Sequence, residues 1–389
     1  MSSMYFTEEH QLFRESLRNF LKKEVVPHID EWENKGEIDF KTIWKKIGNM
    51  GFFGIHYPEA YGGSDLDIFY TVILQEELQR INSGGFAAAV WAHVYLAMTH
   101  LNAEGSEAIK QNYLVPSITG DKLGCLCITE PSGGSDVAGM RTTAVKDGDS
   151  YIINGSKTFI TNGFYSDYLV LAAKTNPEIG NKGISIFVID RDTPGISATK
   201  LNKLGWRASD TAEIAFDNVK VPAINLLGEE NQGFSYIMQH FSIERLVMGI
   251  NAHARAEFAL EYTLNYMSER TAFGKELNKF QALRHRYVDM YADMEICKAY
   301  NYSIAARLDK GEYVVKEASI SKLKSTKMAD AVIYECLQFL GGYGYMEDYP
   351  LARMLRDSRL GPIGGGTSEI LKEILSKMVI DKKEYRPQI

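Results

Sequence analysis

The chain has 389 residues, of which 45% are hydrophobic and 24% charged, a composition typical of a folded protein with more than one domain. It carries 43 basic and 50 acidic residues, so its net charge of −7 lacks the basic excess that nucleic-acid binders usually show. Four cysteines are too few for a disulfide-stapled scaffold and predict reduced thiols in a cytoplasm-like compartment.

The N-terminal third of the chain has the pattern of packed helices. Thr7, followed by two glutamates, marks a helix start, because acidic side chains in a first turn interact favourably with the helix dipole. Pro27 ends that helix, since proline lacks the N–H that a helix interior needs. Further helices are expected at residues 40–50, 66–80 and 86–101.

No segment has the pattern of a targeting peptide or a membrane span. The N-terminal residues lack the basic and then apolar stretch of a signal peptide. The most apolar run, Phe86–Met98, is interrupted by His93 and is shorter than the ~20 residues that cross a bilayer. We therefore expect a buried helix there, no membrane insertion and a cytoplasmic location.

From about Lys122 the pattern changes to short β-rich runs separated by turn residues such as Asn154-Gly155 and Asn162-Gly163. Dense turn signals between short strands predict an antiparallel barrel or sandwich of about a hundred residues. The expected strands lie at residues 123–128, 142–146, 151–160, 168–173, 184–190 and 211–216.

From Gly233 the chain is helical again, in long periodic segments of the kind that pack as an antiparallel bundle. Helices are expected at residues 234–269, 280–309, 314–340 and 367–379. The predicted fold class is α+β and multidomain. Its parts are an N-terminal helical domain (1–121), a middle antiparallel β-barrel-like domain (122–232) and a C-terminal four-helix-bundle domain (233–389).

Two long motifs are the most specific features of the sequence. In the first, Cys127–Gly139, a strand ends in a loop of small residues with free backbone N–H groups and hydroxyls, which can approach the edge of a flat polar ring system. The second, Gln338–Tyr345 and the polar residues that follow, is a helix end with a glycine-rich turn. A surface turn or a helix cap would explain either motif alone. Together, and in this order, they resemble the two signatures of the acyl-CoA dehydrogenase family.

This resemblance implies an FAD-dependent enzyme that acts on an acyl-CoA thioester. A carboxylate removes the α-proton while a hydride leaves the β-carbon for flavin N5, and the product is a trans-2-enoyl-CoA. Electron-transferring flavoprotein then accepts the electrons. Such chemistry needs a base over the α-carbon, donors to the thioester carbonyl and a dry site. The resemblance also implies a homotetramer, a dimer of dimers in which each FAD is shared between subunits.

The resemblance assigns FAD contacts residue by residue. Thr161 matches the hydroxyl that faces flavin N5, and Phe159 stands where many relatives have a tryptophan. Arg270 and Phe273 match residues that reach the FAD of a neighbouring subunit, and the planar fork of an arginine suits a pyrophosphate. The remaining expected contacts are Ile128, Thr129, Gly134 and Ser135 at the flavin ring and its phosphate side, Gln281, Gln338, Gly341 and Gly342 near the adenosine half, and Thr367 and Ser368 at the start of the last helix.

The catalytic base is expected at Glu244. Many family members carry it in a Tyr-Glu-Gly-Thr string before the last helix, but the corresponding residues here are Gly364-Gly365-Gly366-Thr367. Isovaleryl-CoA and long-chain acyl-CoA dehydrogenases instead place the glutamate before an arginine in an early turn of the first long C-terminal helix, and Glu244-Arg245 matches that segment. Alone, this pair would indicate a surface ion pair. The resemblance implies that Arg245 orients the base and that the Gly365 N–H binds the thioester carbonyl.

Substrate contacts are expected at Ser135, Arg245, Gly364 and Gly365. Straight-chain relatives usually carry a tyrosine at the Gly364 position, so glycine leaves room for a branched acyl group, with a medium-to-long straight chain as the alternative.

Two other functions on the same scaffold stay open from the sequence. One is an acyl-CoA-oxidase-like flavoenzyme that uses oxygen, and the other is a non-catalytic binding protein, for which the net charge of −7 is unfavourable. The eight histidines, His100 and His240 among them, show no metal-ligand spacing, so we expect no metal site.

Overall fold

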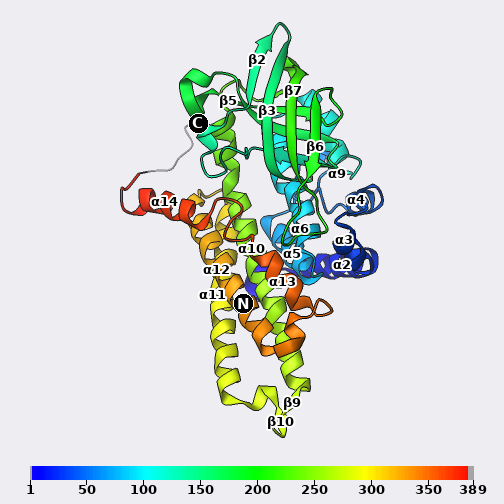
Figure 1. Cartoon of the computed structure of the whole chain (residues 1–389), viewed down its shortest axis with the longest axis vertical. Coiled ribbons are helices and arrows are strands. Elements are labelled where there is room, and N and C mark those ends of the chain that lie inside the picture. Colours follow the sequence, from blue (N-terminus) through cyan, green and yellow to red (C-terminus); the bar gives the residue numbers. More distant parts are fainter. Residues whose placement is uncertain (1, 384–389) are drawn as a thin grey trace.

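The structure is a computed structural model and describes residues 2–383. Figure 1 shows the sheet of the middle part at one end of the molecule, the N-terminal helices packed against it, and long C-terminal helices that extend away from it. The N-terminal helices are α1 (Ser2–Tyr5), α2 (Glu8–Glu24), α3 (Ile29–Lys35), α4 (Phe40–Asn49), α5 (Ile68–Arg80), α6 (Gly84–Trp91), α7 (Met98–Glu104), α8 (Glu107–Ile109) and α9 (Val115–Ile118).

The start of α2 follows the expected capping. The Thr7 hydroxyl accepts a hydrogen bond from the backbone N–H of His10 at 3.4 Å, which satisfies one of the free donors of the first turn. The helix expected at 86–101 forms in three parts, because a π-helical segment, Ala92–Ala97, separates α6 from α7. Such π-segments are frequent near functional sites, and this one packs between β1 and α10.

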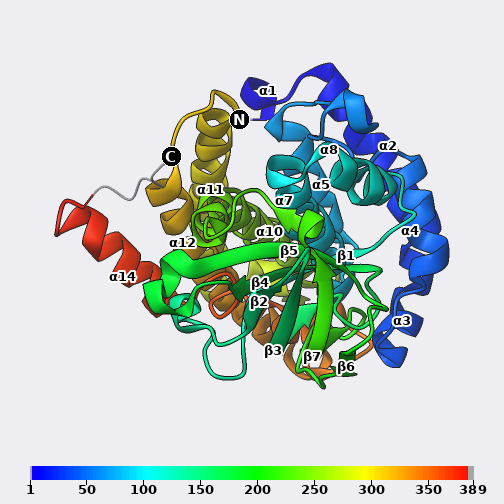
Figure 2. The same ribbon diagram turned by 90° about the horizontal axis from the view of Figure 1, so that it is seen from above.

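The middle part is one eight-stranded sheet with the order β6-β7-β3-β2-β4-β5-β8, in which β1 pairs with β4. Figure 2 shows the sheet lying across one end of the helices. Its strands are β1 (Gly124–Cys127), β2 (Thr143–Asp147), β3 (Ser150–Thr161), β4 (Tyr168–Lys174), β5 (Ile184–Asp190), β6 (Ile196–Lys200), β7 (Thr211–Pro222) and β8 (Leu226–Leu227).

The sheet is mixed where an all-antiparallel arrangement was predicted. β1 runs parallel to β4, and one parallel bridge joins Thr143 of β2 to Lys174 of β4. Between β1 and β4 lie the first motif and the β2–β3 hairpin, a connection long enough to bring the chain back in the same direction. Strands β6 and β8 were not predicted. β6 has no fully buried side chain and β8 has two residues, so neither shows a strong apolar pattern.

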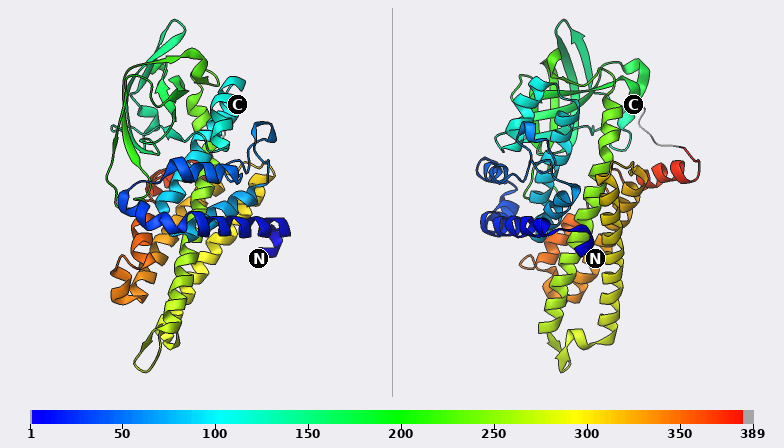
Figure 3. Two further views of the ribbon diagram at one scale, coloured as in Figure 1. Left: turned by 90° about the vertical axis from the view of Figure 1, so that its right-hand side faces the viewer. Right: turned by 180° about the vertical axis from the view of Figure 1, so that it is seen from behind.

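The C-terminal part is built around α10, which is 37 residues long and packs against α5, α11 and α12. Figure 3 shows that α10 runs from the sheet to the far tip of the molecule, where a short hairpin turns the chain into α11. No helix within residues 2–383 has both the length and the apolar character needed to span a bilayer. The elements are α10 (Gly233–Glu269), β9 (Thr271–Ala272), β10 (Lys275–Glu276), α11 (Gln281–Asp309), α12 (Val315–Phe339), α13 (Pro350–Ser358) and α14 (Ser368–Val379).

Candidate active site

Glu244 lies on the buried side of α10, and its exposed fraction is 6%. Burial raises the pKa of Glu244 to about 7, and the positive charges of Arg245 and Lys322 oppose part of that rise. A carboxyl group with a pKa near neutrality is substantially ionised at pH 7 and is still basic enough to accept a proton. Glu244 therefore has the properties of a general base.

Helix α12 supplies the polar partners of the Glu244 region. Arg245 Nη1 donates to Ser319 Oγ at 3.2 Å, and Lys322 Nζ donates to the backbone carbonyl of Gly366 at 2.6 Å. Lys322 is fully buried, and this burial lowers its pKa to about 8. The helix thus ties the glycine-rich turn before α14 to the segment that carries Glu244. The motifs did not identify Lys322, because a lysine in a helix normally lies at the surface.

The glycine-rich turn closes directly over Glu244. Gly365 has a φ of 60°, and a Cβ atom there would lie 2.4 Å from Met248 Sδ and 3.3 Å from Glu244 Oε1. Any larger residue would adopt a strained backbone and collide with Met248. The structure therefore brings the backbone of the turn close to the Glu244 carboxylate, although the two are more than 100 residues apart in the sequence.

A buried ion pair holds the loop that follows β1. Lys157 Nζ donates to Glu130 Oε1 at 2.8 Å and to the carbonyl of Ile128 at 3.0 Å. Glu130 also accepts the backbone N–H groups of Arg141 at 2.6 Å and Thr142 at 2.9 Å. Burial alone would raise the pKa of Glu130, but Lys157 and these donors lower it to about 2. The loop is thereby fixed against β3.

Phe159 is exposed by a local irregularity of β3. The pairing of β3 with β7 shifts between Lys157 and Ile160, and Phe159 has a φ of 59°. The ring is 70% exposed, since a β-bulge redirects a side chain away from the sheet. A bulky residue held in this backbone region is unusual and marks a functional candidate. Thr161 follows at the end of the same strand.

A second set of expected cofactor residues lies toward the far tip of the molecule. Phe273, in the turn between β9 and β10, is 97% exposed, and Arg270 Cζ lies 5.8 Å from the centre of the Tyr343 ring. Arg270 is 26 residues after Glu244, about 39 Å farther along a helix that rises 1.5 Å per residue. The expected residues thus form two separate groups in one chain. The tip group lies around the β9–β10 turn and at the end of α12, where Tyr266 Oη donates to the Leu340 carbonyl at 3.4 Å; its members are Arg270, Phe273, Gln281, Gln338, Gly341 and Gly342. The second group follows β1, ends β3 or belongs to the turn before α14 and its first residues; its members are Ile128, Thr129, Gly134, Ser135, Phe159, Thr161, Gly364, Gly365, Thr367 and Ser368.

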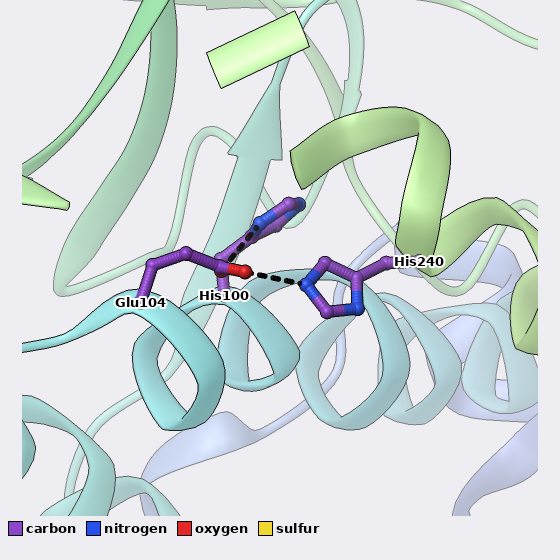
Figure 4. Close-up of side chains that lie close together, drawn as sticks. All are labelled: His100, Glu104 and His240. Atoms are coloured by element: carbon purple, nitrogen blue, oxygen red, sulfur yellow. Dashed lines mark hydrogen bonds and ion pairs between the residues drawn. The ribbon is translucent and has the colours of Figure 1, made fainter. Parts of the chain in front are cut away.

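Two histidines that are far apart in the sequence meet around one carboxylate. Figure 4 shows Glu104 between His100 and His240: its oxygens accept hydrogen bonds from His240 Nε2 at 2.8 Å and His100 Nδ1 at 3.2 Å. Among residues 2–383 this is the one group of side chains with metal-ligand geometry. Its three members already satisfy one another, and they tie α7 to the turn of α10 that precedes Glu244. Sequence spacing did not predict the cluster.

Comparison with known proteins identifies the family to which this architecture belongs. Three domain families match in order: acyl-CoA dehydrogenase N-terminal domain at residues 7–121, middle domain at 125–219 and C-terminal domain at 231–380. The chain belongs to the acyl-CoA dehydrogenase family. It is therefore an oxidoreductase, and the members of this family use FAD.

Relatives match over nearly the whole chain. It is 38% identical to the mitochondrial long-chain specific acyl-CoA dehydrogenase of Sus scrofa over 97% of this chain and 88% of that protein. It is 36% identical to the mitochondrial isovaleryl-CoA dehydrogenase of Pongo abelii over 95% of this chain and 88% of that protein. The crystal structure of an acyl-CoA dehydrogenase from Geobacillus kaustophilus superposes with a TM-score of 0.94 at 41% identity and covers 96% of this chain and 99% of that one.

The residues near the sheet fit a flavin ring. The Phe159 ring is exposed, and the hydroxyls of Thr129, Ser135 and Thr161 have no side-chain hydrogen bond within residues 2–383. Gly134 leaves space beside them, because a Cβ there would touch only Thr129, at 3.5 Å. An open aromatic face with free hydroxyls suits a flat ring with polar edges.

Proposed function

We propose that this protein oxidises an acyl-CoA thioester to its trans-2-enoyl-CoA, with Glu244 as the base that removes the α-proton. The observation that carries the proposal is the buried Glu244 carboxylate, whose pKa is about 7. Its Oε1 atom lies 3.3 Å from the position that a Cβ atom would take at Gly365. FAD, when bound, accepts the hydride that leaves the β-carbon. The relatives named long-chain and isovaleryl-CoA dehydrogenase support this assignment.

In this mechanism the chain holds the thioester and excludes water. The backbone N–H of Gly365 would bind the thioester carbonyl and stabilise the negative charge that develops when the α-proton leaves. Lys322 would keep the glycine turn in place through Gly366. Arg245, which Ser319 holds, would orient Glu244.

The test is anaerobic mixing of the FAD-loaded protein with acyl-CoAs of different length and branching. We expect the flavin absorbance to bleach, to recover slowly in air and to recover rapidly with electron-transferring flavoprotein. Rapid recovery in air with stoichiometric peroxide would replace this proposal by an oxidase, and absence of bleaching with every acyl-CoA would replace it by a binding function.

We propose a branched or medium-to-long acyl group as the substrate, because Gly364 leaves space beside the base. A Cβ at this position would lie 3.7 Å from Leu360 and 4.0 Å from Met248, both ordinary contact distances. Gly364→Tyr should therefore fold and fill the space. We expect kcat/KM for branched acyl-CoAs to fall about tenfold relative to straight chains, since even one methylene in a pocket contributes ~1–3 kcal/mol.

Gly364→Ala is the matched control and should change this ratio little. Equal losses for branched and straight chains with Gly364→Tyr would show that Gly364 does not shape the pocket.

We also propose a cytoplasmic homotetramer in which each FAD is bound by two subunits. The support is the separation of the two residue groups in one chain, together with the exposed Phe273 ring at the tip. Arg270→Ala should lose FAD on dialysis without changing turnover per bound flavin. Arg270→Lys should lose FAD to a similar degree, because lysine lacks the planar fork that pairs with a pyrophosphate. Light scattering that gave a stable, flavin-loaded monomer would contradict the shared site.

A further inference from the structure

A pocket lies next to the base, between α6, α10 and the turn after α13. Its walls include Ala88, Trp91, Met248, Ala252 and Gly361. Met248 also touches the glycine-rich turn that covers Glu244. The pocket therefore adjoins the position at which the thioester would react, and its walls there are small or apolar.

The pocket follows one face of α10. Glu244, Met248, Ala252 and Arg255 are separated by four, four and three residues, which places them on the same side of a helix. From Glu244 to Arg255 the helix advances by about 16 Å at 1.5 Å per residue. An acyl chain that enters beside Glu244 and follows this face ends near Arg255, which lines the far side of the pocket.

Arg255 has donor capacity that the protein does not use. Its Nε and Nη2 atoms donate to one oxygen, Gln79 Oε1, at 3.0 and 2.6 Å. Within residues 2–383 its Nη1 has no hydrogen bond, and the guanidinium has no ion pair with a carboxylate. Burial lowers the pKa of Arg255, and the more distant Asp357, Asp330 and Glu33 oppose this. A largely buried cation without a direct anionic partner is costly, so this half-buried arginine favours a ligand that supplies one.

The other polar groups of the pocket include a second donor without a partner and several groups that are already engaged. Trp206 Nε1 is buried without a hydrogen-bond partner in the described part of the chain. The Asp357 oxygens accept the backbone N–H groups of Gly84 at 2.9 Å and Trp206 at 2.6 Å. Asn251 Oδ1 accepts from Gln79 Nε2 at 3.1 Å. The pocket thus offers unused donors on Arg255 and Trp206, and the Asp357 carboxylate that also lines it already accepts two backbone N–H groups.

We propose that this pocket takes the far end of the acyl chain and that Arg255 binds a hydrogen-bond-accepting group there, foremost a carboxylate. This inference rests on the acyl-CoA dehydrogenase function proposed above and specifies its substrate. A terminal hydroxyl can also accept from Arg255 but binds less strongly, because it carries no negative charge and cannot accept the two parallel hydrogen bonds that a carboxylate accepts from arginine.

The experiment compares acyl-CoAs of equal chain length that end in a methyl, a hydroxyl or a carboxyl group. For the FAD-loaded wild-type protein we expect kcat/KM to be highest for the carboxyl-ended chain, lower for the hydroxyl-ended chain and lowest for the methyl-ended chain. Arg255→Met should lower the ratio of kcat/KM for the carboxyl-ended chain to kcat/KM for the methyl-ended chain about ten- to hundredfold. Arg255→Lys should lower it less, since it keeps the charge. The exposed Arg284→Met on α11 is the matched control and should leave the ratio unchanged.

Binding is the second readout and does not need turnover. Spectral titration of the Glu244→Gln protein should give the lowest dissociation constant for the carboxyl-ended chain and the highest for the methyl-ended chain. In the Glu244→Gln, Arg255→Met double variant the three dissociation constants should be similar. If an Arg255→Met protein does not retain FAD, the inference is tested by the kcat/KM ratios of the wild type and of Arg255→Lys. Equal ratios in wild type and in the Arg255 variants would overturn this inference alone, whereas absence of flavin reduction by every acyl-CoA would overturn the proposed function.

Discussion

Replacing Glu244 by glutamine should abolish nearly all flavin reduction by acyl-CoA while FAD and ligand binding persist. Loss of a positioned general base typically costs at least about 10²–10⁴-fold in rate, and glutamine has nearly the same shape but cannot accept the proton. The measurement is the single-turnover rate of flavin bleaching after anaerobic mixing. An active Glu244→Gln protein would end the assignment of the base.

The same substitution should not destabilise the fold, so a loss of activity can be attributed to lost catalysis and not to unfolding. The pKa of Glu244 is about 7, above its ordinary 4.5. Ionising the buried carboxyl therefore costs folding free energy, and this cost appears as the pH rises above about 4.5. Glutamine removes the cost, so the variant should melt no lower than wild type at pH 8. In the wild type, kcat/KM should rise with pH and level off above about 7, as Glu244 of the free enzyme loses its proton.

Periodicity and turn residues were sufficient to predict most of the helices. The strongly amphipathic α4 and the long α11 and α12 begin and end within about one residue of the expected positions. The apolar stripe of α4 defines that helix, and Gly311 and Gly341 mark the ends of α11 and α12. The short strand β6, whose side chains are half-buried or exposed, gave no such signal. The direction of β1 also depends on a tertiary pairing that local sequence does not determine.

The candidate base was accessible from sequence, but its surroundings were not. Glu244 is identified by a motif within one helix. Lys322 and Met248 gain their significance only because α10, α12 and the glycine-rich turn meet. The same is true of Arg255, whose partner Gln79 lies on another helix. A helix pattern shows which face is buried, and it does not show which polar groups share a pocket on that face.

The largest expected effect on stability comes from the ion pair beneath the loop that follows β1. Glu130→Ala removes the only carboxylate that the fully buried Lys157 contacts within residues 2–383. Breaking a buried pair from one side typically costs about 3–5 kcal/mol, because the remaining charge stays buried and unpaired. The loop also loses its bonds to the backbone N–H groups of Arg141 and Thr142, so FAD should be retained less well. Denaturant unfolding and the flavin-to-protein ratio measure these effects.

The matched control for this prediction is the double variant Glu130→Ala, Lys157→Met, which removes both charges. It should recover much of the lost stability, since replacing a buried pair by apolar groups is often close to neutral. The pH dependence gives an independent test. The pKa of Glu130 is about 2, below its ordinary 4.5, so the pair stabilises the fold fully above about pH 4.5 and loses this contribution as the pH falls toward 2. The wild type should therefore lose stability over this range by more than the double variant. If the two proteins lost stability equally, Glu130 would not be the group that links the loop to acid unfolding.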